Sequence, residues 1–438
     1  MLRTIPENIL YKMKRDTPKI VVSGNKGKIY DFQPLEAAGM KGGVFFRLPS
    51  YELIKLPCGS ELFMLPNRVP VGYDNKEKRF VVLKGVLAVA AFVPPGHTIT
   101  YNSAYAEINK PKMLPLFSYG AVVFYKGEFY VAATRVDKEL RHDLRFMNMD
   151  LARKNAARYK KLFPRNRLIK HLENCAFIYG CPTAKNFFLG KYECPLPAAP
   201  HCNARCIGCI SYQPNKRCAV AQPRIKFLPT PEEVAEVALY HIKNVKDPVA
   251  SFGQGCEGEP LLVDKVIEKS IRLIRSKTDK GIININTNAS RPEVIAKLLD
   301  IGLNSIRVSL NSARECYYVR YYKPKGYTFR DMIKSIKITN IKKGFVSINY
   351  LTMPGFTDSE AEFAAFRRFV ESYKIDMIQW RNLNFDPLRY FKELKIPVDD
   401  SKPLGIRQII CSLKKSFPRI MMGYFNPSKC RIKRKRMV

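Results

Sequence analysis

Three cysteines lie close together near the middle of the chain, at Cys202, Cys206 and Cys209. Thiolates are soft ligands that favour iron-sulfur clusters or zinc. A short loop with gaps of three and two residues can hold three corners of a [4Fe-4S] cluster and leave one iron open for reaction. A tetrahedral structural zinc needs a fourth ligand, which Cys218 or His201 could supply. A zinc knuckle is therefore the alternative interpretation.

The elements downstream of this loop alternate between predicted helices and strands. Capping-box patterns at 230–233, 290–293 and 357–360 predict three helix starts. Short apolar runs between and beyond them predict strands at 249–252, 282–285, 306–310, 345–350 and 377–380. This alternation predicts right-handed βαβ units and a parallel sheet, and therefore an α/β fold.

Polar segments follow three of the predicted strands, at 258–260, 286–288 and 309–311. A parallel barrel, complete or partial, displays its chemistry at the C-terminal ends of the strands. We therefore expect these segments and the cysteine loop to converge at one edge of the sheet.

Over residues 195–385 or so, these motifs resemble the radical S-adenosylmethionine (radical SAM) superfamily. The resemblance implies a partial (β/α)6 barrel in which the three cysteines bind three irons of a [4Fe-4S] cluster. The amino and carboxylate groups of S-adenosyl-L-methionine (SAM) chelate the fourth iron in that family. Reductive cleavage then gives a 5′-deoxyadenosyl radical that removes a hydrogen atom from the substrate. An electron donor such as a flavodoxin or ferredoxin is implied as a partner.

The resemblance also extends to the cofactor pocket. The segment 258–260 looks like the family's GGEP motif, so Gly258 and Glu259 are expected to help seat SAM. The strand-end residues Asn288, Ser309 and Asn349 are expected to line its pocket. No catalytic side chain beyond the cofactor is assigned.

The chain departs from the family pattern at two positions. Glu257 stands where the first glycine of GGEP is usual, and Gly208 precedes the third cysteine, where a bulky or aromatic residue near the adenine is usual. The adenine contact could pass to Ile207, Ile210 or Tyr212.

The length of 438 residues predicts two or three domains with a large core, and the hydrophobic share of 46% is typical of a globular chain. We expect a β-rich N-terminal domain at 1–137, a basic, cysteine-containing connector at 138–195, the core barrel at 196–395 and a basic extension at 396–438. The N-terminal prediction follows from β-rich stretches at 44–48, 79–93, 98–108 and 121–136, with a hairpin turn at Lys126-Gly127.

The charge is strongly positive: 75 Lys and Arg against 38 Asp and Glu give +37. A field of this size attracts polyanions. Eight basic and no acidic residues fall within 151–170, although such a run is most often a solvated helix face. Within 317–329, aromatic and basic residues alternate, which favours base stacking or simple packing of a loop. The basic run at 429–436 could also be a disordered tail.

These features favour RNA as the substrate, with modification of a transfer RNA base. A peptide or protein threaded between the β domain and the barrel is the alternative. A non-enzymatic, zinc-containing nucleic-acid-binding protein is the third possibility. The sequence leaves open which reaction follows radical formation.

Four further cysteines, Cys175, Cys181, Cys194 and Cys218, could bind a second cluster or zinc, although their spacing is irregular. Cys256 is by default a small buried thiol. The opening Met1 to Asp16 has no apolar run suited to a signal peptide, and no stretch reaches the 18 or more apolar residues of a membrane span. The sequence thus predicts a cytoplasmic protein without a membrane partner, whose cysteines serve metal or redox chemistry rather than disulfides.

Overall fold

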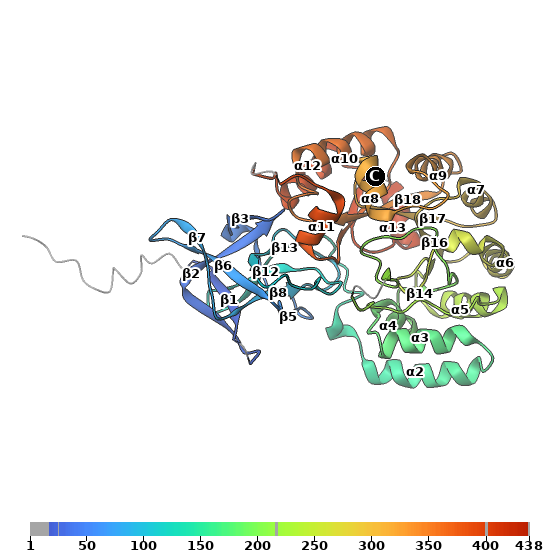
Figure 1. Cartoon of the computed structure of the whole chain (residues 1–438). Coiled ribbons are helices and arrows are strands. Elements are labelled where there is room, and N and C mark those ends of the chain that lie inside the picture. Colours follow the sequence, from blue (N-terminus) through green and yellow to red (C-terminus); the bar gives the residue numbers. More distant parts are fainter. Residues whose placement is uncertain (1–16, 25, 215–217, 399–401, 437–438) are drawn as a thin grey trace, which may run out of the picture.

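The computed structural model describes residues 17–24, 26–214, 218–398 and 402–436 (Figure 1). It contains an antiparallel sheet of thirteen strands in the N-terminal part and a parallel sheet of seven strands in the remainder. In Figure 1 the two sheets lie side by side, and helices surround the parallel sheet.

Each strand of the parallel sheet pairs with the next one along the chain. The order is linear, with β14 and β20 at the two edges, so the sheet is not closed, as expected for a partial barrel, and the predicted α/β fold is confirmed. The strands are β14 (Glu193–Pro195), β15 (Val249–Phe252), β16 (Ile282–Thr287), β17 (Ser305–Leu310), β18 (Phe345–Thr352), β19 (Met377–Asn382) and β20 (Met421–Gly423). The sheet extends beyond the expected range 196–395 at both ends, since β14 precedes it and β20 follows it.

The connections between these strands are helical, as the alternating pattern predicted. Strands β15 and β16 are buried along their whole length because helices cover the outer face of the sheet (Figure 1). The helices are α5 (Pro231–Asn244), α6 (Asp264–Arg275), α7 (Pro292–Asp300), α8 (Glu315–Tyr322), α9 (Phe329–Ile341), α10 (Glu360–Ser372), α11 (Pro387–Leu394) and α12 (Ile406–Ser416). A short 3-10 helix, η5 (Pro260–Val263), precedes α6.

Of the three predicted capping boxes, the one at α5 is confirmed, with Thr230 as the N-cap. The other two predictions are wrong. Helix α7 begins after Arg291 without a side-chain cap, because the hydroxyl of Ser290 instead accepts a hydrogen bond from Asn203. Helix α10 is capped by Ser359, because the hydroxyl of Thr357 accepts from the amide of Met353 in the preceding turn.

The N-terminal part is β-rich, as predicted, with a hairpin between the last two strands. Its turn residues, Lys126 and Gly127, have φ values of 50° and 78°, which match the right-handed twist of a two-residue hairpin. The strands are β1 (Lys19–Ser23), β2 (Ile29–Lys41), β3 (Val44–Arg47), β4 (Leu53–Lys55), β5 (Glu61–Met64), β6 (Arg68–Asp74), β7 (Arg79–Val82), β8 (Leu87–Phe92), β9 (His97–Ile99), β10 (Asn102–Ser103), β11 (Tyr105–Glu107), β12 (Gly120–Tyr125) and β13 (Glu128–Arg135). We call this part the β domain.

The β domain packs against loops that follow the carboxyl ends of β18 and β19. Lys41 forms an ion pair of 2.6 Å with Asp358, and the two side chains are 2% and 0% exposed. Arg68 pairs with Asp386 at 3.1 Å, also out of solvent. Separating such a pair leaves an uncompensated buried charge, which costs free energy. These two ion pairs therefore hold the β domain beside the end of the sheet where chemistry is expected.

The connector folds into helices α2 (Met149–Leu162), α3 (Arg167–Phe177) and α4 (Pro182–Phe188), which lie next to α5 (Figure 1). The side-chain amide of Asn166 donates to the carbonyl oxygen of Glu233, which ties α3 to α5. The basic run at the C-terminus forms α13 (Lys429–Arg436), whose Ile432 is buried against the sheet. This helix corrects the idea of a disordered tail for the described part of the run.

Burial of His241 in α5 predicts acid sensitivity. Burial lowers the pKa of this imidazole from 6.5 to about 4, and Nε2 lies 3.2 Å from the carbonyl oxygen of Tyr192. The unfolded chain therefore takes up a proton at higher pH than the native chain, so stability present above pH 6.5 is lost as pH falls toward 4. We expect a loss of roughly 3 kcal/mol from this group. Urea unfolding from pH 7 to pH 4 measures it, and His241→Gln should flatten that part of the profile; equal profiles would contradict the assignment.

No helix among the described residues combines the length and the apolar character that a membrane crossing requires. The expectation about a signal peptide concerns residues 1–16, which lie outside the described residues.

Candidate functional site

The cysteine loop is held against the segment 258–260 by backbone hydrogen bonds. The amide of Gly258 donates to the carbonyl oxygen of Ala199 (2.6 Å), and the amide of Glu259 donates to that of His201 (2.9 Å). A β-carbon on Gly258 would lie 1.8 Å from the carbonyl oxygen of His201. A glycine is needed here because the backbone of the segment touches the backbone of the loop.

The opposite side of the loop is held by the end of α8. The amides of Arg205 and Ile207 donate to the carbonyl oxygens of Tyr322 (2.9 Å) and Tyr321 (3.1 Å). The amide of Lys325 donates to the carbonyl oxygen of Asn203 (2.8 Å). The loop thus lies between two backbone segments, and hydrogen bonds to both segments fix its position.

The aromatic residues of 317–329 mostly lie in the core rather than on a surface that could stack bases. Tyr318 is fully buried, and Tyr321, Tyr322, Tyr327 and Phe329 are at most 7% exposed. Their rings pack on one another and beneath the cysteine loop. Of the two interpretations of this segment, base stacking and packing of a loop, packing is therefore the role of these five rings.

The three thiols of the loop are partly exposed and unpaired by disulfides. Burial raises the pKa of Cys202 to about 11, and burial followed by the neighbouring thiols raises the pKa of Cys206. The guanidinium of Arg224 donates a hydrogen bond to Sγ of Cys209 at 3.6 Å. Because bound metal requires thiolates, these thiols release protons when they become ligands.

The three thiols are not gathered around one point as the ligands of a single ion would be. Among the described residues, the one group of three or more potential ligands whose atoms all lie within 4.8 Å of one another is elsewhere in the chain. The three thiols, which influence one another electrostatically, do not form such a group, as the ligands of one tetrahedral zinc would. A cube that takes each thiolate on a different iron accommodates this arrangement.

Two buried carboxylates organise the segment next to the loop. Glu257 accepts hydrogen bonds from the amides of Ala198 (2.8 Å), Ala199 (3.0 Å) and Gln254 (2.6 Å). Glu259 accepts from the amide of Asn288 at 2.8 Å. Burial raises the pKa of both carboxyls to about 7. Glu257 therefore replaces the usual glycine with a side chain that fixes the approach to the cysteine loop.

Asn288, predicted at the cofactor pocket, joins the end of β16 to the cysteine loop. Its side-chain amide donates to Oδ1 of Asn203 at 2.7 Å, and Asn203 in turn donates to the hydroxyl of Ser290 at 3.0 Å. Asn203 lies between the first two cysteines, and no sequence pattern pointed to it. The structure shows that Asn288, Gly258 and Glu259 position the cysteine loop. Their contacts with the cofactor remain predictions.

The two other predicted pocket residues, Ser309 and Asn349, are paired in register on β17 and β18. Both keep part of their surface exposed, and Oδ1 of Asn349 has no hydrogen-bond partner among the described residues. A buried carbonyl oxygen without a partner is costly unless a ligand or water satisfies it. This atom fits a polar cofactor bound at the carboxyl ends of the strands.

Two arginines also belong to the parallel strands, and sequence reasoning missed both. Burial, and then the charge of Arg381, lower the pKa of Arg307 to about 9. Nε of Arg307 has no hydrogen-bond partner among the described residues, and Arg381 lies 4.1 Å from the ring centre of Tyr424. Each arginine alternates with apolar residues along its strand. This pattern could have predicted that the two side chains face the interior of the barrel.

Gly208 leaves room for aromatic groups from elsewhere in the chain. A β-carbon there would lie 2.9 Å from the hydroxyl of Tyr321 and 3.6 Å from the ring of Phe385. Of the residues expected to replace the missing side chain, Ile207 is buried in the core and Tyr212 is 46% exposed. The structure thus explains the glycine by packing and leaves the adenine contact a prediction.

The remaining cysteines are not all gathered. Cys194 is fully buried in β14, and Cys218 is a partly buried residue beyond the loop. Cys175 instead lies beside Cys256, which is a buried thiol, as expected. A surface cavity of about 720 Å³ opens near Pro248 and Gly281, at the amino ends of β15 and β16 and so away from the cysteine loop.

Comparison with known proteins gives one family. Residues 196–367 match the model of the radical SAM superfamily. The FeMo cofactor biosynthesis protein NifB of Klebsiella pneumoniae is 25% identical over 182 residues, which are 37% of this chain and 38% of that protein. The chain therefore spans less than two fifths of the length of this curated relative.

Similar solved structures include methylornithine synthase, at 15% identity over 57% of this chain and 70% of that one, with a TM-score of 0.37. A radical SAM methyltransferase from Sphaerobacter thermophilus is 14% identical over 46% of this chain and 63% of its own, with a TM-score of 0.36. Identity and TM-score are low in both cases, so these two similarities carry no conclusion about activity or substrate.

Proposed function

We propose that this chain, a radical SAM enzyme by virtue of the domain at residues 196–367, modifies RNA, with a transfer RNA base as the target. Enzymes of this family use a [4Fe-4S] cluster and SAM, which supply a 5′-deoxyadenosyl radical when the cluster is reduced. The observation that carries the proposal is a clamped three-thiol loop at the carboxyl ends of a parallel sheet, in a chain of net charge +37. The family match also removes the support for a non-enzymatic zinc protein.

The chain's own residues would hold, orient and shield the reacting groups. Cys202, Cys206 and Cys209 would bind the cluster, and the backbone at Gly258 would bring the SAM-binding segment beside it. Oδ1 of Asn349 would gain a hydrogen-bond partner. The β domain, fixed beside β18 and β19, would help to exclude water from this end of the sheet.

An RNA substrate is supported by exposed positive charge on the connector. All eight basic residues of 151–170 are exposed, and two of them, Lys160 and Arg167, form ion pairs with glutamates. Of the other six, Arg153 and Arg158 lie over the rings of Phe177 and Tyr159, whereas Lys154, Lys161, Arg165 and Lys170 have neither an ion-pair partner nor a ring contact among the described residues. Lys154 and Lys161 are seven residues apart on α2, which puts them on one face. Helix α2 lies at the outer edge of the molecule (Figure 1), where a polyanion can reach it.

A second support is the charge inside the barrel. Arg307 and Arg381 place two guanidinium groups on strands whose ends meet near the proposed cofactor. Arginine binds phosphate oxygens through paired N–H donors, so an anionic group of the substrate would compensate two like charges held close together.

A peptide substrate is the second candidate. It is favoured by the contact between the β domain and the barrel, where Thr98 donates its hydroxyl hydrogen to the carbonyl oxygen of Trp380 (3.1 Å) and the amide of Ile99 donates to Asn382 (2.9 Å). A chain threaded at this junction would meet both parts of the protein.

Neutralising the connector face should weaken RNA binding. We expect the variant with Lys154, Lys161, Arg165 and Lys170 replaced by Gln to bind unmodified transfer RNA more weakly. The slope of log affinity against log salt concentration should decrease in magnitude for each phosphate that the variant no longer neutralises. The decrease is about 0.9 per phosphate for a duplex or about 0.7 for a single strand. Fluorescence anisotropy between 50 mM and 200 mM salt, a range over which binding to phosphates responds strongly, measures both effects.

The matched control removes the same charge from exposed positions of the β domain, at Lys76, Lys78, Lys84 and Lys126. Equal loss of affinity in both variants would show attraction by net charge alone. If transfer RNA binds neither the wild type nor the control at low salt, the RNA proposal is contradicted and a peptide substrate is favoured. A comparison of modified nucleosides from cells with and without the gene tests the reaction itself.

A further inference from the structure

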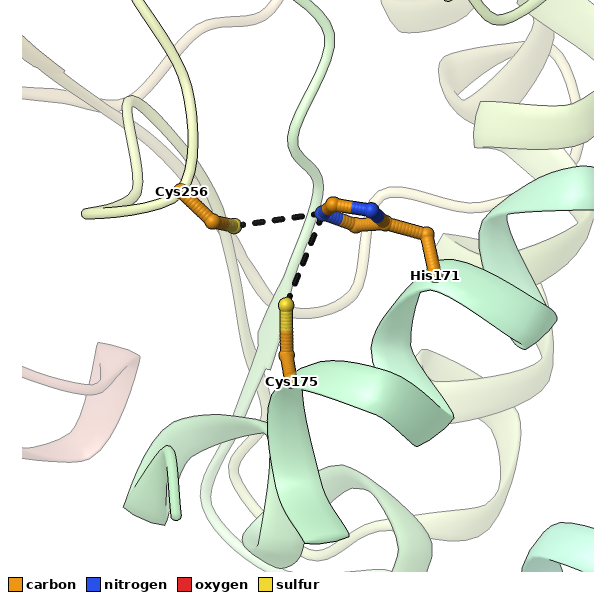
Figure 2. Close-up of side chains that lie close together, drawn as sticks. All are labelled: His171, Cys175 and Cys256. Atoms are coloured by element: carbon orange, nitrogen blue, oxygen red, sulfur yellow. Dashed lines mark hydrogen bonds between the residues drawn. The ribbon is translucent and has the colours of Figure 1, made fainter. Parts of the chain in front are cut away.

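Three potential metal ligands meet outside the cysteine loop (Figure 2). His171 and Cys175 are four residues apart on α3, so their side chains lie on one face of the helix. Cys256 comes from the segment that follows β15. Nε2 of His171 lies 3.4 Å from Sγ of Cys256 and 3.5 Å from Sγ of Cys175, and Figure 2 shows all three side chains pointing toward one another.

These distances match the edges of a tetrahedral zinc site. Zinc binds sulfur at about 2.3 Å and imidazole nitrogen at about 2.0–2.1 Å, so a tetrahedron places N and S about 3.6 Å apart and two S atoms about 3.8 Å apart. The two measured N–S separations are 3.4 and 3.5 Å, and all three ligand atoms lie within 4.8 Å. The thiolates of a four-iron cluster sit on different irons and need a wider spread.

We propose that His171, Cys175 and Cys256 bind a zinc ion, with Cys181 as the fourth ligand. The donor set is that of a Cys3His structural site, in which soft thiolates and one imidazole hold a closed tetrahedron. Cys175 and Cys256 are 2% and 3% exposed, so the ion is shielded from water on the sulfur side.

Cys181 is the thiol placed to complete the set. Its amide donates to the carbonyl oxygen of Cys175 at 2.8 Å, which brings the two backbones into contact. Burial is the main cause that raises the pKa of the Cys181 thiol, and the neighbouring Cys175 thiol adds to it. Its sulfur lies outside the three-residue group, so closing the tetrahedron requires a rotation of its side chain.

The site would join the connector to the segment that touches the cysteine loop. Cys256 is two residues before Gly258, whose backbone contacts the loop at Ala199. A zinc ion bound by α3 and by Cys256 would fix the position of this segment from its other side. The proposal is independent of the substrate, because it concerns a different metal and different ligands.

The test is the zinc content of the full-length chain in which Cys202, Cys206 and Cys209 are all replaced by Ala, so that the cysteine loop cannot hold metal. After purification with zinc and exchange into metal-free buffer, we expect about one tightly bound zinc per chain. Adding Cys175→Ser or Cys256→Ser should reduce it at least fivefold, as should His171→Ala. The matched control is Cys194→Ala, at a buried cysteine outside the group, which should leave zinc unchanged.

A second measurement, substitution of cobalt(II) for zinc, does not depend on whether the variants fold. Its absorption spectrum is recorded on the chain that keeps His171, Cys175 and Cys256. We expect thiolate-to-cobalt charge-transfer bands together with the d–d bands of a tetrahedral site. Zinc that persists in Cys175→Ser and Cys256→Ser, an octahedral cobalt spectrum, or iron in place of zinc would each overturn the proposal. Undiminished zinc in Cys181→Ser would overturn the assignment of the fourth ligand.

Discussion

Replacement of Cys206 with alanine is expected to abolish the cleavage of SAM. The thiol lies between the two other cysteines of the loop and is enclosed by the same backbone hydrogen bonds. We expect bound iron to fall from about four per chain toward zero, and 5′-deoxyadenosine formation to fall by at least about 100-fold, equivalent to about 2.7 kcal/mol.

The measurement is iron content together with chromatography of 5′-deoxyadenosine after anaerobic reconstitution and reduction. Cys411→Ala is a suitable control, because Cys411 is an exposed cysteine on α12. Cleavage that survives in Cys206→Ala at the wild-type rate would mean that the loop does not hold the reacting cluster.

Replacement of Gly258 with alanine should have an effect of similar size without touching any ligand. The new β-carbon would lie 1.8 Å from the carbonyl oxygen of His201 and 3.1 Å from the amide nitrogen of Cys202. Both are backbone atoms, so the loop itself has to move. Overpacking of this kind costs about 1–3 kcal/mol, and a displacement of the first cysteine by about 1 Å is enough to lower a rate about 100-fold.

We expect Gly258→Ala to retain its fold, as judged by circular dichroism, and to show reduced iron content and strongly reduced SAM cleavage. Gly24→Ala in the β domain is the matched control, since the nearest atom to its β-carbon would be 3.8 Å away. Wild-type iron content and cleavage in Gly258→Ala would contradict the packing described for the loop.

Much of the barrel could be predicted from the sequence because its signals are local. Apolar runs between helix caps located the strands to within a few residues, and the polar ends of those strands lie at one edge, as parallel topology requires. The capping box at Thr230 was found for the same reason, since both of its partners are three residues apart.

What could not be predicted depends on contacts between distant residues. Ser290 has the type and spacing of a helix cap, yet its hydroxyl bonds to Asn203, which is 87 residues away. The aromatic residues at 317–329 have the pattern of a stacking surface, and only the position of α8 beneath the cysteine loop shows that they are buried.

The second group of metal ligands was partly visible in the sequence. Cys175 and Cys181 were candidates for a second metal site, but His171 and Cys256 were not associated with them. His171 and Cys256 are 85 residues apart in the sequence, and no spacing rule covers such a distance. The structure supplies that pairing, and it leaves the sulfur atoms of Cys181, Cys194 and Cys218 outside the three-residue group.

The sheet continues past the border that composition predicted at residue 395, and the last strand is too short to be recognised in the sequence. Strand β20 has three residues, Met421–Gly423, and is too short to give a periodic signal. It nevertheless pairs with β19 and completes the edge of the sheet. Composition had assigned it to a basic extension, because the charged residues around it dominate that segment.

A cluster with one open iron in the cysteine loop is tested most directly by electron paramagnetic resonance of the reduced wild-type chain, recorded before and after the addition of SAM. A thiolate-held cluster of this kind predicts the signal of a single reduced [4Fe-4S] centre that changes when SAM is added, and no such signal in Cys206→Ala. A reduced cluster whose signal is identical with and without SAM, or a signal that remains in Cys206→Ala, would contradict the assignment of the loop.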